Sequence, residues 1–294
     1  MNVIDRLQNI YKNLDKRTGG VLRILKSTVE SFGKARGSQA AAAVSYYALF
    51  SLFPLLLVLV AAGSYFLEGD PVQSVMNLVA EAIPLSRELI ERNLEQVLNS
   101  RGAVGLIGLL TLLWSASGVF GVLATNINLA WPDAEKRSFI MQRSLAIGIV
   151  VILLCLLVVA VVGSTIMNIL SEFQVPVPGT VQIYGTFIWG LLSNFLAWFF
   201  SLLALLAIYR WLPNTEVNWR AAFWGALFSA TTWEIATSVF VWYLGSGLNR
   251  YKLVYGSLGA VIALLFIIYI SSLIILFGAH LSSAVQRSQV DDDS

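Results

Sequence analysis

The sequence predicts an all-α membrane protein with six transmembrane helices, and with amphipathic helices at the N-terminus and in the first outer loop. Of the 294 residues, 57% are hydrophobic and only 12% are charged, whereas about 25% of the residues in a soluble domain carry charge. A helix rises about 1.5 Å per residue, so about 20 apolar residues cross the ~30 Å hydrocarbon layer. Six apolar runs meet this requirement: Ala40–Phe66, Ala103–Leu129, Ser144–Leu170, Val181–Ile208, Trp219–Leu244 and Gly256–Ala284.

The runs are expected to be helices rather than barrel strands. Transmembrane strands alternate apolar and polar residues, but Val150–Val162 is apolar without alternation. A backbone in lipid must satisfy its own hydrogen bonds, which a helix does within one segment.

The basic residues predict the orientation of the chain. Fourteen Lys and Arg residues lie before the first run, after the second and fourth runs and in the tail, against five in the opposite connections. Positive residues stay on the cytoplasmic side. We therefore expect a multi-pass membrane protein with both termini in the cytoplasm.

Three segments are predicted outside the six-helix domain, which covers residues 40–287. Residues 1–39 form a cytoplasmic basic segment in which apolar residues recur at helical spacing from Ile4 to Leu14; it is either an interfacial helix on anionic lipid or a solvated arm. Arg36–Ser38 is expected to hinge this segment to the first span. Residues 67–102 are expected to form two amphipathic helices separated by Pro84, which pack on the bundle or act as a gate. Residues 288–294 form an acidic cytoplasmic tail.

Glu234 is the main candidate for a functional residue, because a carboxylate inside a span is costly. Thr231, Glu234 and Ser238 stand on one helical stripe, which we expect to face the interior of the bundle. The stripe is interpreted either as a proton- or ligand-coupled site or as a structural hydrogen bond between helices.

Other candidates are a kink and a small-residue face. Pro54 is expected to kink the first span beyond Tyr46 and Tyr47. Gly118, Gly121 and Asn128 follow one side of the second span together with Thr125. Small residues at this spacing favour close helix packing over substrate contact, inside one subunit or between two copies of a homo-oligomer.

The remaining candidates lie near the ends of the spans. Arg210 and Pro213 end the fourth span, where Arg210 is expected to reach lipid phosphates or, less favourably, Glu234. Gly256 and Gly259 open the sixth span as a flexible, closely packing turn. Arg250 and Lys252, just before it, either contact anionic headgroups or only reach the interface.

Enzymatic chemistry is not expected. His280 is the single histidine, and the only serine motif, at Ser117, lies at a different predicted depth, so a catalytic pair is not expected. Clustered metal ligands and phosphate-binding glycine loops are absent from the sequence. We expect no metal, no cofactor and no nucleic-acid partner.

Several segments resemble the YihY/virulence factor BrkB family. They are Ala40–Pro54, Leu113–Gly118, Asn128-x-x-Trp131, Tyr209–Asn214, Trp233–Glu234 and Tyr255–Ala260. The resemblance implies a six-span bacterial inner-membrane protein, and it implies a link to lipid export that some members of the family have. The family also carries an old ribonuclease label, which no residue cluster here supports. Where the family has Gly-Ala-Glu-Leu, this chain has Gly278–Ala–His280–Leu281, so a pH-sensitive histidine is expected in place of the acid.

The sequence therefore leads to two hypotheses of function. In the first, the protein is a transporter or flippase-like protein for an anionic lipid or amphipathic solute. Its route is expected to be lined by Glu234, Tyr46, Tyr47, Asn128 and Arg210. In the second, it is an assembly or scaffold protein that does not transport, and its polar residues only join helices.

Overall fold

The computed structural model describes residues 20–66, 101–152, 187–246 and 258–293, and in these ranges every regular element is a helix. The labelled helices are α2 (Val21–Lys34), α3 (Gly37–Phe66), α6 (Arg101–Asn128), α8 (Phe187–Trp211), α9 (Trp219–Gly245) and α11 (Leu258–Asp293). One further helix, Phe139–Ile152, enters the predicted third span. The N-terminal residues to 19, the outer loop 67–100, and Arg250, Lys252 and Gly256 lie outside the described residues.

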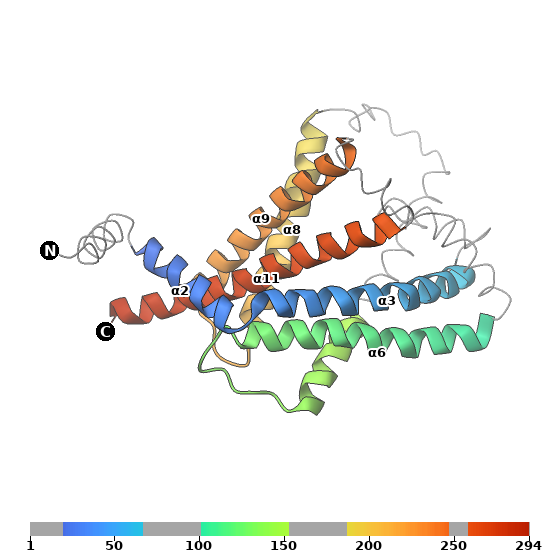
Figure 1. Cartoon of the computed structure of the whole chain (residues 1–294), viewed down its shortest axis with the longest axis horizontal. Helices are drawn as coiled ribbons and strands as arrows, with labels where there is room; N and C mark the ends of the chain where they lie inside the picture. The colour runs from blue at the N-terminus through green and yellow to red at the C-terminus, as the bar shows by residue number, and fades with distance from the viewer. Residues whose placement is uncertain (1–19, 67–100, 153–186, 247–257, 294) are drawn as a thin grey trace, which may run out of the picture.

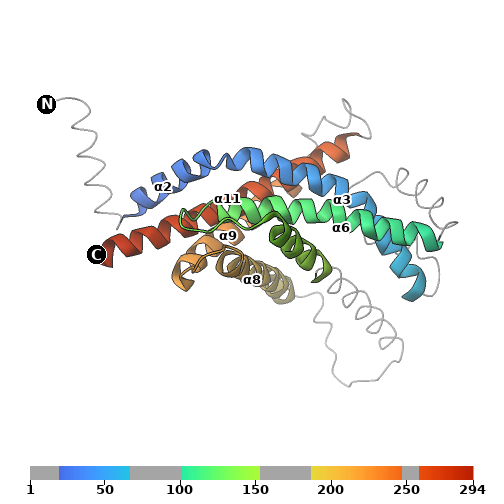
Figure 2. The same cartoon turned by 90° about the horizontal axis from the view of Figure 1, so that it is seen from below.

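The helices converge at one end of the molecule and spread apart at the other (Figure 1). α3 packs on α6, and α11 contacts α2, α3 and α9. Figure 2 shows that α8 and α9 diverge from α3 and α6 away from the α2 end. Hydrogen bonds join α2 to the last turns of α11, with Arg23 Nη2 donating to Ser288 Oγ at 3.1 Å. α2 and the last turns of α11 therefore lie at the same end, which is the end predicted to be cytoplasmic.

Side-chain exposure agrees with an apolar environment around the bundle. Leu110–Asn128 and Val261–Gln289 are each long and apolar enough to cross a membrane. Large apolar side chains point outward from other helices as well, among them Phe200 (64% exposed) and Trp242 (65% exposed). Such broad apolar exposure is unfavourable in water and favourable in lipid. The prediction of an apolar helical membrane protein is supported, whereas the count of six spans stays a prediction.

Helix boundaries follow local sequence signals. Gly20 precedes α2 with φ 84°, and Arg36 has φ 54° between α2 and α3, in the left-handed region that is costly for most residues. The chain therefore turns where a hinge was predicted. Asn218 caps α9 by accepting a hydrogen bond from the Arg220 backbone N–H at 3.3 Å. α3 continues through Pro54 as a curved helix (Figure 2).

Two segments differ from the predicted organisation. Part of the predicted basic segment 1–39 forms α2, an amphipathic helix that the apolar spacing of residues 4–14 did not indicate. α11 does not stop before the predicted acidic tail but continues to Asp293. Its last turns are supported by α2 and by Asn218, whose side-chain Nδ2 donates to Gln289 Oε1 at 3.2 Å.

The core lies near the converging end and is built mainly from small residues. Ala222, Ala226 and Ala230 of α9 are buried next to Tyr209 of α8 and Leu276 of α11. At the α9–α11 crossing, an added Cβ on Gly225 would lie 2.6 Å from the Gly278 carbonyl oxygen. The two backbones approach so closely because neither glycine has a side chain.

Candidate functional site

Two small cavities follow one side of α6 and bring together several of the predicted residues. The Tyr47 cavity, of about 130 Å³, is lined by Tyr47, Ser117, Gly118, Gly121, Val122, Phe139, Gln142 and Arg143. The Asn128 cavity, of about 190 Å³, is lined by Ala124, Thr125, Asn128, Leu129, Lys136, Arg137 and Gln142. Gln142 borders both, so we treat them as one feature, the α6 cavities. Ser117 and Asn128 are 11 residues apart, or about 16 Å along the helix, which is roughly half the hydrocarbon thickness.

Gln142 fixes the Phe139–Ile152 helix beside α6. Its Nε2 donates to the Gly121 carbonyl oxygen at 2.8 Å and also contacts the Thr125 hydroxyl. An added Cβ at Gly121 would lie 3.9 Å from Gln142 Nε2, an ordinary van der Waals contact, so Gln142 packs directly beside this glycine. A polar contact of this kind between helices is costly to remove in lipid, where no water replaces it.

The predicted small-residue face of α6 has two roles in the structure. An added Cβ at Gly118 would lie 2.7 Å from Tyr47 Cδ1, so Gly118 allows α3 and α6 to approach closely, as predicted. Gly121 and Asn128, in contrast, border the cavities. Packing alone therefore does not describe this face.

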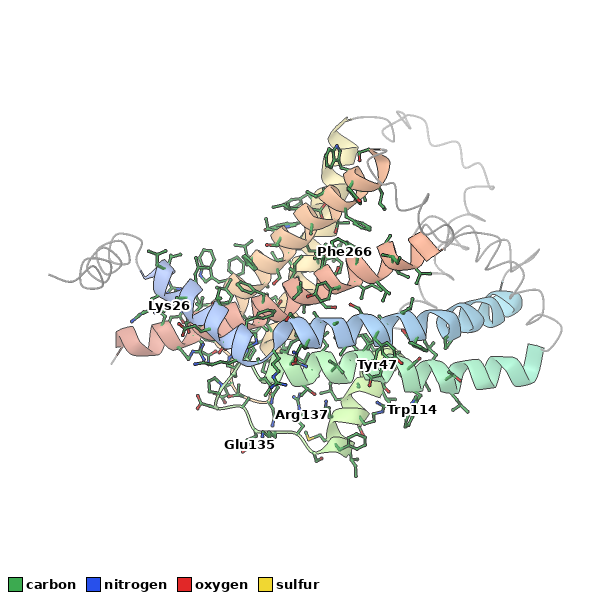
Figure 3. The ribbon with its side chains drawn as sticks, in the orientation of Figure 1. Lys26, Tyr47, Trp114, Glu135, Arg137 and Phe266 are labelled. Carbon is green, nitrogen blue, oxygen red and sulfur yellow. The ribbon has the colours of Figure 1, made fainter. Side chains whose placement is uncertain are left out.

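Three cationic side chains line the α6 cavities, two of them at the predicted cytoplasmic end and one farther along α6. Lys136 and Arg137 line the Asn128 cavity, and Arg143 lines the Tyr47 cavity. The Arg143 guanidinium lies 4.4 Å from the centre of the Trp114 ring and donates to the Trp114 carbonyl oxygen at 3.1 Å. Burial lowers the pKa of Arg137, and its Nε has no hydrogen-bond partner within the described ranges. Figure 3 shows Arg137 near the loop, with Tyr47 and Trp114 farther along the α3–α6 pair.

Sequence analysis used these three basic residues only to predict orientation, and it did not identify Gln142 as a candidate. The sequence contained only a weak signal for Gln142. Gln142 lies in the first turn of the Phe139–Ile152 helix, where it, Arg143 and Ser144 interrupt an apolar sequence.

Asn128 joins three segments. Its Oδ1 accepts from the Asn214 backbone N–H at 2.7 Å, and its Nδ2 donates to the Glu135 carbonyl oxygen at 3.0 Å. Asn214 Nδ2 donates to the same carbonyl at 3.3 Å. Pro213 is buried beside this junction. Asn128 thus positions the loop that carries Lys136 and Arg137, in addition to lining a cavity.

The predicted inward orientation of the polar stripe on α9 is wrong. Thr231, Glu234 and Ser238 are exposed, whereas the α9–α11 crossing runs through Gly225 and Ser229. At about 100° per residue, the stripe lies roughly 140° or more around the helix from Ser229. Small residues occupy the packed face because they let α8 and α11 approach, so the larger carboxylate is left on the other side.

Arg210 and Tyr46 also lie outside the α6 cavities. The Arg210 guanidinium is 5.4 Å from the centre of the Trp219 ring, and no ion pair joins it to Glu234 in the described part of the chain. Tyr46 is 56% exposed and packs edge-on against Tyr47. Gly259 is buried in the first turn of α11.

His280 contacts α2 rather than a serine on α6. Its Nδ1 lies 2.8 Å from Ser31 Oγ, and its ring packs edge-on against Phe32. Ser117 Oγ instead donates to the Trp114 carbonyl oxygen at 2.7 Å. Among the described residues, no group of three His, Cys, Asp or Glu side chains is placed to hold a metal ion.

The sequence of this chain matches a known family along most of its length. The model of the virulence factor BrkB family covers residues 28–294. The chain belongs to this family. No solved structure matches it.

Relatives of this BrkB-family chain are found in distant bacteria. It is 29% identical to YfkH of Bacillus subtilis (strain 168), which is named as ribonuclease-like, over 93% of this chain and 99% of that protein. It is 26% identical to a UPF0761 membrane protein of Pseudoalteromonas translucida, over 85% of this chain and 81% of that protein. A UPF0761 membrane protein of Neisseria meningitidis serogroup B is 27% identical over 98% of this chain and 68% of its own length. These matches confirm the family resemblance noted in the sequence. They also confirm that the chain is a membrane protein.

Proposed function

We propose that this BrkB-family protein moves an anionic lipid or a similar amphipathic anion across the inner membrane along the α6 cavities. The observation that carries the proposal is the line of polar groups from Lys136 and Arg137, through Gln142, to Ser117 and Tyr47. Cationic residues at the mouth would attract the charged group of the substrate. Hydroxyl and amide groups further along would replace part of its hydration.

The exposed aromatic surface beside the cavities supports an amphipathic substrate rather than a small ion. Trp114 is 74% exposed and Phe139 is 78% exposed. A molecule with an acyl chain could keep its tail on this apolar surface while its charged group contacts the polar cavities. This arrangement needs no tunnel wide enough for a whole lipid.

The alternative function is assembly or scaffolding without transport. It is favoured by the hydrogen bonds of Asn128 and Gln142, since each of those bonds joins protein groups to one another. In this case the cavities would be packing defects with no ligand. Catalysis is not proposed, because Ser117 and His280 are each bonded to other residues, and we expect no ribonuclease activity.

Transport is tested by reconstituting the purified protein in liposomes that contain fluorescent phosphatidylglycerol. A membrane-impermeant quencher then measures how fast the label moves between leaflets. Gly121→Leu would fill the cavities and is expected to reduce the rate at least tenfold. Gly148→Leu is the matched control, because the space around Gly148 is open, and it should keep the wild-type rate. Labelled phosphatidylcholine tests the selectivity for a net negative charge.

Each outcome decides between the hypotheses. If the wild-type protein moves label no faster than empty vesicles do, the transport proposal is wrong and the scaffold remains. If transport occurs and Gly121→Leu matches Gly148→Leu, the substrate takes another route.

A further inference from the structure

A second, larger pocket lies on the other side of the loop that carries Lys136 and Arg137. It is formed by α2, residues 131–133 and the last turns of α11, and has a volume of about 410 Å³. An adjoining cavity of about 490 Å³ extends it toward the start of α3. Ser27, Pro132 and Arg287 border both parts. We refer to them together as the α2–α11 pocket.

Basic residues outnumber acidic residues around the α2–α11 pocket. The basic residues are Arg23, Lys34, Arg36 and Arg287, and the acidic residues are Glu30 and Asp133. The Glu30 carboxylate is 4.0 Å from Lys26 Nζ, so part of its charge is balanced outside the pocket. Arg287 Nη2 donates to a neutral group, the Ser27 hydroxyl, at 3.2 Å. The pocket therefore offers positive charge to a ligand.

Two buried donors that border the pocket lack hydrogen-bond partners. Ser283 is 1% exposed and Trp131 is 5% exposed. Neither Ser283 Oγ nor Trp131 Nε1 has a partner within the described residues. Unpaired buried polar groups are uncommon, because each loses its hydrogen bonds to water without replacing them. Both groups can donate, and a ligand rich in acceptor oxygens would pair with both.

The depth of the pocket corresponds to the headgroup layer. Gln286, on its wall, accepts from the Asn218 backbone N–H at 3.1 Å. Asn218 directly precedes Trp219, whose exposed ring packs edge-on against Trp211. Exposed tryptophans concentrate at the membrane–water interface. A lipid phosphate and a soluble phosphate can both reach this level.

We propose that the α2–α11 pocket binds the phosphate group of an anionic ligand through the Arg287 guanidinium, the Ser283 hydroxyl and the Trp131 indole N–H. Arginine and hydroxyl donors form strong, charge-assisted hydrogen bonds to phosphate oxygens. The ligand is either a phospholipid headgroup or a soluble phosphate compound. This site meets the α6 cavities at Leu129, which lines both, but its proposed ligand contacts lie on other residues and do not depend on transport.

The test uses the full-length protein in detergent with two probes. Native mass spectrometry measures binding of phosphatidylglycerol against phosphatidylcholine, and calorimetry measures binding of inorganic phosphate. Ser283→Ala removes one proposed donor and should weaken binding about fivefold or more, as expected for a hydrogen bond to a charged group. Arg287→Gln should weaken binding about tenfold or more.

Ser282→Ala is the matched control. Ser282 is as buried as Ser283 and its hydroxyl is also unpaired, but it packs against Gly225 rather than lining the pocket. It should leave binding unchanged. Thermal unfolding of each variant without ligand shows whether the fold is intact. If Arg287→Gln does not fold, the comparison of the two serine variants still decides the question.

Binding of phosphatidylglycerol that is lost in Ser283→Ala supports the site with a lipid ligand. Binding of inorganic phosphate alone, with the same loss, supports it with a soluble ligand. The proposal is overturned if neither probe binds, or if Ser283→Ala and Ser282→Ala bind both probes as the wild type does.

Discussion

The Tyr209 hydroxyl lies 2.8 Å from the Ser229 hydroxyl and donates to the Ile275 carbonyl oxygen at 2.7 Å, so that one side chain of α8 joins α9 and α11. Ser229 has a single hydroxyl hydrogen, which it donates either to Tyr209 Oη or to the Ile274 carbonyl oxygen 3.3 Å away. Gly278 lies beside both hydroxyls. This buried junction adds polar contacts to the apolar core that joins the three helices.

Gly278→Ala should destabilise the protein. The added Cβ would collide with Ser229 Oγ and lie 2.6 Å from Tyr209 Oη, and overpacking of this kind typically costs about 1–3 kcal/mol. Thermal unfolding in detergent should show a clearly lower midpoint. Gly148→Ala, with no atom within 4 Å of the new Cβ, should be neutral or slightly stabilising. Equal midpoints for the two variants would argue against the tight crossing.

Tyr209→Phe should cost about 1 kcal/mol, with an upper range near 2 kcal/mol. The ring remains, but the Ile275 carbonyl and the Ser229 hydroxyl each lose a buried partner. Unfolding by a denaturing detergent gives the difference in free energy. Tyr46→Phe is the control, since Tyr46 is 56% exposed. An unchanged stability for Tyr209→Phe would mean that the hydroxyl is not engaged as described.

Asn128→Leu should loosen the connection between α8 and α9 without unfolding the bundle. The change leaves the Asn214 backbone N–H without its acceptor and the Glu135 carbonyl without one donor. Hydrogen exchange at residues 212–218 should become faster. Asn126→Leu is a matched control, because Asn126 Nδ2 donates only to Val122 of its own helix. Similar exchange in both variants would refute the bridging role.

Glu234→Gln should leave lipid transport unchanged if the α6 cavities are the route. Glu234 is exposed on the face of α9 away from the Ser229 contact, so neutralising it removes no group from the cavities. The liposome assay with labelled phosphatidylglycerol measures the rate. If Glu234→Gln reduced the transport rate as much as Gly121→Leu, Glu234 would lie on the route and the pathway would follow α9.

The sequence was sufficient to predict helices, because continuous apolar runs of this length have few other stable forms in lipid. The predicted start of the run at Trp219 coincides with the start of α9. The family resemblance was also readable from short segments. Helix ends that depend on tertiary support were less predictable, and α11 extends to Asp293 because α2 and Asn218 pack against its last turns.

The orientation of each helix about its own axis was not predictable in the same way. A stripe of three polar residues on α9 suggested an inward face. The inward face is instead the one with the small, buried residues Ala222, Gly225, Ala226 and Ser229, which pack closely against the neighbouring helices. The spacing of those small residues was the better signal. Tyr209 and Gln142 were missed because their partners, a serine 20 residues away and a carbonyl 21 residues away, can be found only in three dimensions.

The Gly225–Gly278 crossing has a mechanical consequence. From Gly225 to the end of α9 at Gly245 the helix extends about 30 Å. The backbones of α9 and α11 meet closely at Gly225 and Gly278, whereas farther along α9 contacts α11 through side chains, with the rings of Phe240 and Phe266 6.1 Å apart. A rotation of about 10° at the crossing would displace the far end of the helix by about 5 Å, since displacement grows with distance along a rigid rod. A small change of angle at the two glycines would therefore become a much larger change of spacing at the far end of α9.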